Sequence, residues 1–206
     1  MAAIIGRKVG MTQMFGEDGQ RVPLTLIEAG PCPVTQVKTA ATDGYEAVQL
    51  GFGVAKPRRL TSPERGHLRK AAAPSVKHLH EFAPDELGRE VTVGDVVTVE
   101  GFEPGSVVRV SGTSRGKGYA GTVKRHHFKR GPESHGSHNV RQPGSIGAAA
   151  YPARVMKGLR MSGHLGAQRV TQRGLQVVDR DPDRNLLVLR GAVPGAAGGI
   201  VVVRPE

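Results

Sequence analysis

The chain has 206 residues, with 29 Lys and Arg against 18 Asp and Glu, which gives a formal net charge of +11. That length suits one domain of ordinary size with room for a small insertion. A single cysteine, Cys32, excludes an intrachain disulfide and cannot make a zinc site alone. No apolar run approaches the roughly 20 residues that span a bilayer, and no secretory pattern is present, so we expect a cytoplasmic protein. The positive charge favours a polyanionic partner.

Strand patterns dominate the first 54 residues, where helical periodicity is absent. Apolar and polar residues alternate at period two, as they do in half-buried antiparallel strands. After an apolar start at residues 2–12, strands are predicted at residues 14–15, 22–28, 34–39 and 45–50, the last two with clear alternation. Asp18-Gly19 lies between two of them and indicates a hairpin, because both residues tolerate positive φ.

The composition changes at residues 55–90, which we interpret as a small insertion that carries the main helix. Ser62 can cap this helix, and Pro63 suits its first turn. The helix is predicted to run to about Ala73 and to stop before Pro74. A strand at 76–82 and a turn at 84–88 complete the predicted insertion.

Short apolar strands resume after the insertion and are predicted at residues 91–99, 106–110, 175–179, 185–190 and 200–203. Because evenly spaced strands lie on both sides of a long basic stretch, they favour one closed antiparallel β-barrel. The predicted barrel domain therefore comprises residues 1–108 and 174–206. Residues 109–173 form a long basic irregular extension, and the predicted fold class is mainly β.

The extension contains 13 Lys and Arg against one acid, Glu133, so its formal charge is +12. Glycines recur and large apolar side chains are sparse, so it cannot bury enough surface to offset the entropy of its own ordering. Strands anchor it at both ends, and we expect it to become ordered on nucleic acid. Its cations would neutralise phosphates, while His126, His127 and Phe128 would stack on unpaired bases. A general DNA or RNA chaperone with a disordered arm is an alternative.

Two glycine-rich patterns resemble nucleotide-binding loops but lack the required context. Gly116–Gly121 matches G-x-G-x-x-G, yet no apolar helical face follows it and no acid lies about 20 residues further on. Gly112–Lys117 is one residue too short between its glycines for a phosphate-binding loop. A nucleotide-dependent enzyme that uses residues 116–121 is the alternative from another class.

Histidines in the extension do not predict a metal or catalytic site. His135 and His138 have a tolerable spacing for metal ligands, but the surrounding positive charge would repel a divalent cation. Ser134 and Ser137 each precede a histidine, yet no acid is placed to orient the imidazole. We therefore expect no enzymatic activity, no metal and no cofactor.

Motifs distributed over nearly the whole chain, in the same order, resemble the universal large-subunit ribosomal protein three family in its bacterial form. The glycine-rich basic segment Gly112–Arg125 carries the resemblance most clearly. The other matching stretches are Gly6–Thr12, Val34–Lys38, Asp43–Tyr45, Pro143–Gly147, Arg169–Thr171, Asn185–Leu187 and Gly191–Gly195. Arg109 departs from the family pattern, which usually has Asp or Asn there, so a local contact at this position is expected to differ.

The resemblance implies a structural, non-enzymatic constituent of the large ribosomal subunit. Its barrel would resemble the second domain of translation factors. It would bind large-subunit ribosomal RNA near the 3′ end, extend toward the peptidyl-transferase region and assist early subunit assembly. Its protein neighbours would be the fourteenth and nineteenth large-subunit proteins, with no membrane and no small-molecule substrate. Ala150 occupies the place of a Gln that is methylated in some relatives, so no modification is expected.

The predicted RNA-binding residues combine the extension with the basic pair near the start of the chain. They are Arg7, Lys8, Arg115, Lys117, Lys124, Arg125, His126, His127, Phe128, Lys129, Arg130, His135, His138, Arg141, Arg154, Lys157, Arg160, His164 and Arg169.

Overall fold

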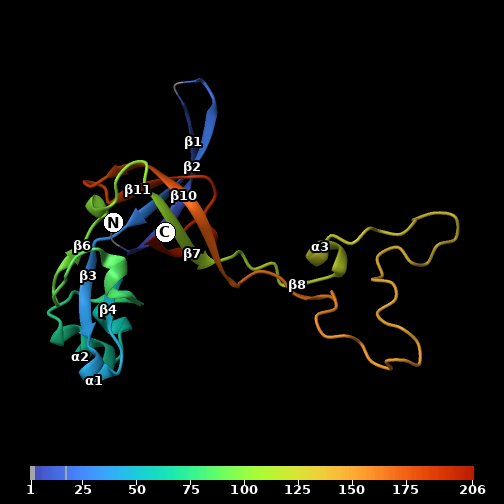
Figure 1. Cartoon of the computed structure of the whole chain (residues 1–206), viewed down its shortest axis with the longest axis horizontal. Coiled ribbons are helices and arrows are strands. Elements are labelled where there is room, and N and C mark those ends of the chain that lie inside the picture. The colour runs from blue at the N-terminus through green and yellow to red at the C-terminus, as the bar shows by residue number, and fades with distance from the viewer. Residues whose placement is uncertain (1–2, 17) are drawn as a thin grey trace. The chain divides into compact units, whose positions relative to one another are not determined.

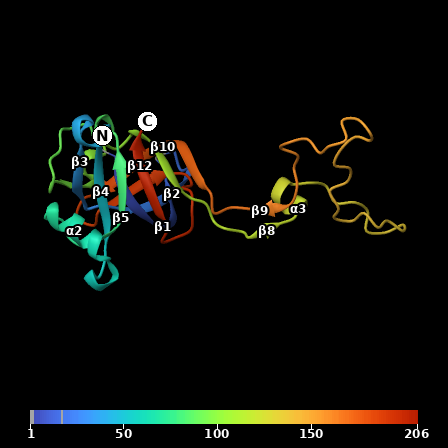
Figure 2. The same cartoon turned by 90° about the horizontal axis from the view of Figure 1, so that it is seen from below.

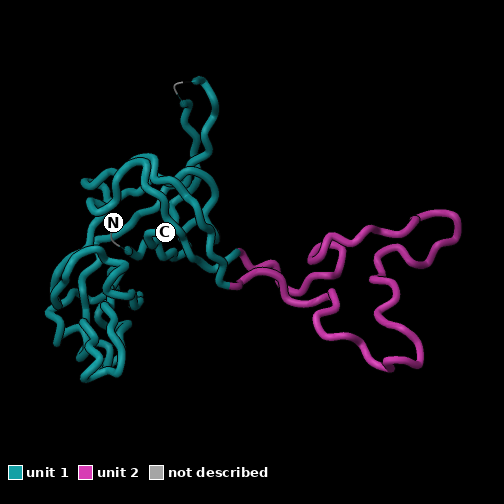
Figure 3. The backbone as a smooth tube through the Cα atoms, in the orientation of Figure 1, with its two compact units in different colours: residues 1–114, 169–206 teal, residues 115–168 magenta. Residues whose placement is uncertain are grey.

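The structure, a computed structural model, describes residues 3–16 and 18–206 (Figure 1). The chain divides into two compact units (Figure 3). Unit 1 comprises Met1–Ser114 with Arg169–Glu206, and unit 2 comprises Arg115–Gln168. The regular structure is mostly antiparallel strands with a few short helices, so the prediction of a mainly β protein is confirmed.

Six strands of unit 1 pair in a closed ring, so that each has a hydrogen-bonded neighbour on both sides. All of the pairs are antiparallel, and the order around the ring is β1-β12-β7-β10-β11-β2. The strands are β1 (Ile4–Phe15), β2 (Arg21–Ala29), β7 (Val107–Thr113), β10 (Arg169–Asp181), β11 (Leu186–Arg190) and β12 (Ile200–Pro205). Closure leaves no unpaired sheet edge within the ring itself.

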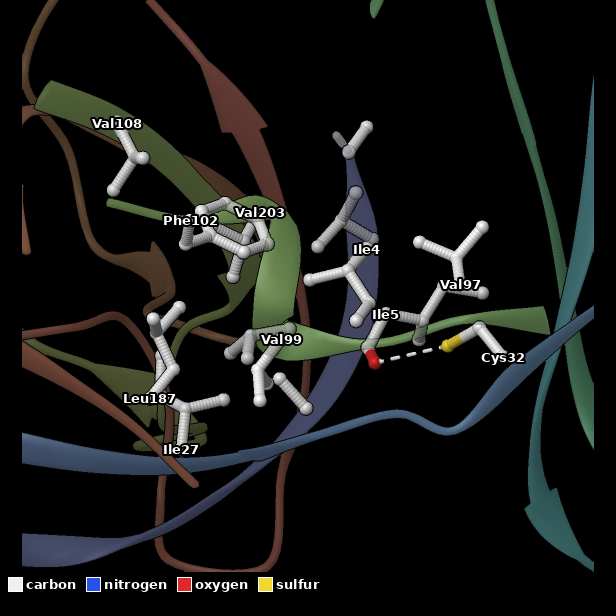
Figure 4. Close-up of a cluster of buried hydrophobic side chains, with 14 of the residues drawn as sticks. Ile4, Ile5, Ile27, Cys32, Val97, Val99, Phe102, Val108, Leu187 and Val203 are labelled. Atoms are coloured by element: carbon white, nitrogen blue, oxygen red, sulfur yellow. Dashed lines mark hydrogen bonds between the residues drawn. The ribbon is translucent and has the colours of Figure 1, made fainter. Parts of the chain in front are cut away.

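The interior of the ring is filled by the apolar side chains that alternation turns inward. Val108 and Val203 are fully buried, as are Ile27 and Leu187. Phe102 reaches the same cluster from the loop before β7, where Figure 4 places it beside Val108 and Val203. Burying one such side chain contributes about 1.5–3 kcal/mol, so this cluster is the main source of stability in unit 1.

A second sheet in unit 1 has the order β5-β4-β3-β6. Its strands are β3 (Cys32–Lys38), β4 (Ala47–Val54), β5 (Val76–Phe82) and β6 (Val96–Val97). The strands predicted at 34–39 and 45–50 therefore lie outside the ring. The long strand predicted at 91–99 shrinks to two residues, because Gly94 has φ +96° and Asp95 accepts a hydrogen bond from the Thr92 amide at 2.7 Å. That turn interrupts the extended chain.

Helix α2 (Ser62–Lys70) is the longest helix among the described residues, and it begins one residue earlier than the predicted cap at Ser62 implies. The N-cap is Thr61 rather than Ser62, because Thr61 and Glu64 form a capping box in which the Thr61 amide donates to Glu64 at 2.7 Å. The helix ends at Lys70, three residues before the predicted end. Shorter helical turns are α1 (Ala40–Asp43), η1 (Pro57–Arg59), η2 (Pro84–Leu87) and η3 (Val99–Gly101).

Unit 2 contains little regular structure. It has a two-residue strand pair, β8 (Tyr119–Ala120) with β9 (Gly163–His164), and the short helix α3 (Thr122–His126), which Figure 2 shows close to that pair. The remaining described residues of unit 2 form turns and irregular chain. Strand β7 continues to Thr113 and β10 begins at Arg169, so the predicted extension 109–173 includes the ends of two ring strands.

Candidate nucleic-acid interface

Unit 2 concentrates the positive charge of the protein. Its 54 residues contain ten Lys and Arg and one acid, Glu133, for a formal charge of +9 out of the total +11. Arg130 forms an ion pair with Glu133, three residues along the chain. The other nine cations have no acid within unit 2 to neutralise them, so the unit attracts polyanions strongly.

The two ends of unit 2 are joined by a small folded element that we call the clasp, residues 117–126 with 161–165. Backbone hydrogen bonds connect Lys117 N to Leu165 O at 2.8 Å and Leu165 N to Gly118 O at 2.9 Å. The Tyr119 hydroxyl lies 2.7 Å from the Ser162 hydroxyl. The clasp is therefore held by main-chain pairing between two segments that residues 127–160 separate in the sequence.

Two of the predicted RNA-binding residues contribute to the clasp. Arg125 Nη1 donates to Met161 O at 2.8 Å, and His126 Nε2 lies 3.0 Å from the same oxygen. Gly163 makes this possible, because a Cβ at that position would lie 2.8 Å from Arg125 Nη1. Both side chains are half-buried, and Thr122 at the start of α3 is buried. Arg125 and His126 thus have a positioning role that residue type alone does not indicate.

Most other predicted residues in unit 2 are exposed to solvent, as phosphate contacts require. Phe128 is half-buried, with its ring centroid 6.1 Å from that of His126. Ala150 is also exposed. The exposed predicted residues of unit 2 are Arg115, Lys117, Lys124, His127, Lys129, Arg130, His135, His138, Arg141, Arg154, Lys157, Arg160 and His164.

Three predicted residues lie in unit 1 and differ in their surroundings. Arg169 is exposed at the start of β10. Arg7 is exposed and forms an ion pair of 2.7 Å with Glu28. Lys8 was predicted at the RNA surface, but its side chain is only 5% exposed and its ammonium donates to Val193 O at 2.7 Å. The prediction for Lys8 needs correction, because alternation in β1 turns this side chain inward, where backbone carbonyls satisfy it.

Two tyrosines in unit 2 were missed by reasoning from charge. Tyr119 is 78% exposed and Tyr151 is 90% exposed, so both rings are available for stacking on a base. A signal was available, since two of the three tyrosines lie in a segment with almost no core.

The glycine-rich segment Gly116–Gly121 is not built as a dinucleotide site. It spans a two-residue strand and leads into α3, which has five residues. Within residues 3–16 and 18–206, no group of three or more His, Cys, Asp and Glu side chains could hold a metal ion. Of the helices that the structure describes, none is long and apolar enough to cross a membrane.

Comparison with known proteins finds one family along the chain. The family model described as Ribosomal protein L3 matches residues 73–185, more than half of the sequence. The large ribosomal subunit protein uL3 of Synechococcus sp. (strain JA-2-3B'a(2-13)) is 54% identical over 203 residues, which cover 98% of this chain and 94% of the relative. The proteins of the same name from Solibacter usitatus (52% identical, 98% and 96% covered) and Thermosynechococcus vestitus (50% identical, 98% and 95% covered) are also similar.

Proposed function

The chain belongs to the ribosomal protein uL3 family, and from that premise we propose how its two units serve the ribosome. It is a structural, non-enzymatic component of the large ribosomal subunit. We propose that unit 2 binds large-subunit ribosomal RNA near its 3′ end and reaches toward the peptidyl-transferase region. The protein would thereby assist early assembly, with the fourteenth and nineteenth large-subunit proteins as neighbours.

The observation that carries this proposal is the charge of unit 2 together with its exposure. Nine cations without an acidic partner in the unit are spread along a chain that has almost no apolar core. RNA helices repel one another through their phosphates, and cations placed between them allow close packing. Unit 2 would neutralise phosphates and fill space, while Tyr119, Tyr151 and His127 would stack on unpaired bases.

The clasp and the ring fix the points at which the RNA-binding loop starts and ends. Arg125 and His126 hold the two ends of unit 2 together, so fewer conformations are lost when the loop meets RNA. We propose that the six-stranded ring is a barrel of the kind found in the second domain of translation factors. It would serve as the mount from which unit 2 leaves and to which it returns.

A pair of lysine variants tests the proposal. Binding of the full chain to a 3′-terminal fragment of the large-subunit RNA is measured at several salt concentrations. Lys117→Met should lower the salt slope by about 1, since one phosphate contact is lost, and should leave the urea midpoint unchanged. Lys8→Met should leave the salt slope unchanged and lower the urea midpoint, because the Lys8 ammonium bonds to carbonyls inside unit 1.

An RNA of equal length and unrelated sequence is the matched control. A general RNA chaperone with a basic arm would bind both RNAs equally, and that result would contradict a specific ribosomal role. Binding that does not weaken with salt would contradict the charge mechanism itself.

A further inference from the structure

The paired ends of β1 and β2 extend beyond the ring as a two-stranded ribbon, which Figure 1 shows projecting from unit 1. The register of β1 with β12 ends at Arg7, and a last pair of hydrogen bonds joins Lys8 to Gly198 and Gly199. From Val9 to Phe15, β1 pairs with β2 on one side and with no other described strand. The ribbon, residues 9–15 with 21–26, therefore has a free β1 edge.

The ribbon exposes an unusual amount of apolar surface. Val9 is 47% exposed, Met11 54%, Met14 41% and Phe15 67%, all within seven residues. Met11 and Phe15 share one face, and Met14 lies on the other, so neither face is covered. Beyond Thr12 the ribbon has only two strands, and such a pair is marginal in water by itself, so a third strand beside β1 would stabilise it.

The two edges of the ribbon are protected differently. Strand β2 carries Arg21 and Pro23, and charge and proline are the usual means of blocking an edge from further pairing. The β1 edge from Val9 to Phe15 contains no charged residue and no proline. An open, apolar edge of this length is a template for strand addition.

The charge of the ribbon favours a protein over RNA as its partner. Residues 9–22 contain two acids, Glu17 and Asp18, and one cation, Arg21, so their formal charge is −1 in a chain of +11. RNA binding needs cations beside phosphates, and residues 9–15 supply none. A protein segment that is extended, apolar on one face and basic would match both the free edge and the net negative charge of residues 9–22.

We propose that the free β1 edge, residues 9–15, docks an extended basic segment of another protein of the large subunit. That segment would add a strand beside β1 and cover Met11 and Phe15. The inference rests on the proposed ribosomal function, and it assigns to the ribbon a protein partner where unit 2 has RNA.

Site-specific photocrosslinking in intact subunits tests this. Phe15→p-benzoylphenylalanine should crosslink to one other large-subunit protein, at a Lys- and Arg-rich extended segment. Tyr119→p-benzoylphenylalanine is the matched control in unit 2 and should crosslink to RNA. Crosslinks from Phe15 to RNA or to a second copy of this chain, or none from Phe15 while Tyr119 reacts, would overturn the proposal. Failure of Tyr119 to reach RNA would instead count against the proposed function.

A charge variant gives a second, independent readout. Phe15→Lys removes the apolar side chain and repels a basic segment, so it should reduce the amount of the crosslinked partner recovered per subunit at least threefold, while the chain still binds its RNA fragment. Leu79→Lys places the same charge on β5, where Leu79 is 41% exposed, and should leave the partner level unchanged. A normal partner level in the Phe15→Lys subunit would refute strand docking.

Discussion

Removal of the Glu86 carboxylate should destabilise unit 1 substantially. Glu86 lies on η2, between two arginines of the ring. Its carboxylate accepts a hydrogen bond from Arg109 Nη2 at 2.7 Å and lies 3.3 Å from Arg204 Nε. The Glu86 side chain is 14% exposed, against 35% for Arg109 and 20% for Arg204. Glu86→Ala would leave two like charges together in a half-buried site.

The size of the loss follows from that exposure. Breaking a fully buried pair costs about 3–5 kcal/mol, and partial exposure of both arginines allows water to screen part of it, so we expect roughly 2–3 kcal/mol. Urea unfolding of the full chain, followed by far-ultraviolet circular dichroism, should show a lower midpoint at an unchanged slope.

Glu28→Ala is the matched control. The Arg7–Glu28 pair has the same 2.7 Å separation, but its side chains are 51% and 38% exposed. Exposed pairs contribute at most about 1 kcal/mol, so this variant should unfold near the wild-type midpoint. Equal midpoints for the Glu86→Ala and Glu28→Ala chains would refute the argument that burial gives the Glu86 pairs their strength.

Two further predictions concern Cys32 and the clasp. Burial raises the pKa of the Cys32 thiol to about 12, against about 8.5 in an unfolded chain. The stabilisation from the neutral thiol is complete below about pH 8.5 and is lost as pH rises toward 12. The urea midpoint of the wild type should therefore fall more steeply between pH 8 and 11 than that of Cys32→Ala. An equal fall of the midpoint in the two chains would contradict this prediction. Gly163→Ala would place a Cβ 2.8 Å from Arg125 Nη1, so the flexible Arg125 side chain would shift and weaken its bond to Met161 O, at a cost of about 0.5–1.5 kcal/mol. Amide exchange at Lys117 and Leu165 should then accelerate severalfold, whereas Gly121→Ala, whose added Cβ meets nothing within 4 Å, should leave it unchanged.

Much of the ring could be predicted because its strands alternate cleanly and lie between turn residues. Val201 and Val203 of β12 are buried, as are Leu187 and Leu189 of β11, and these strands were predicted from periodicity. Periodicity cannot say which sheet a strand joins, so β3 and β4 were assigned to the barrel rather than to the second sheet. Pairing between distant segments decides that, and one sequence does not display it.

Residue type also does not show which cations bond within the protein itself. Lys8 and Arg125 were both predicted to bind RNA, and both donate to backbone carbonyls of this chain. Their partners, Val193 and Met161, lie 185 and 36 residues away in sequence. Such bonds depend on the fold bringing a carbonyl within 3 Å, which charge and spacing cannot reveal.

Ring closure also dictates an order of events during synthesis. Strand β1 pairs with β12, with Ile4 opposite Val203. The first ring strand to be synthesised therefore cannot complete its pairing until the last one has been made. Residues 115–168 leave the ribosome before β10, β11 and β12 do. At about 5–20 residues per second, the last 37 residues, up to Pro205, take roughly 2–7 s. For that interval the complete cationic loop is attached to a sheet that has not yet closed, so it can meet RNA before the ring has formed.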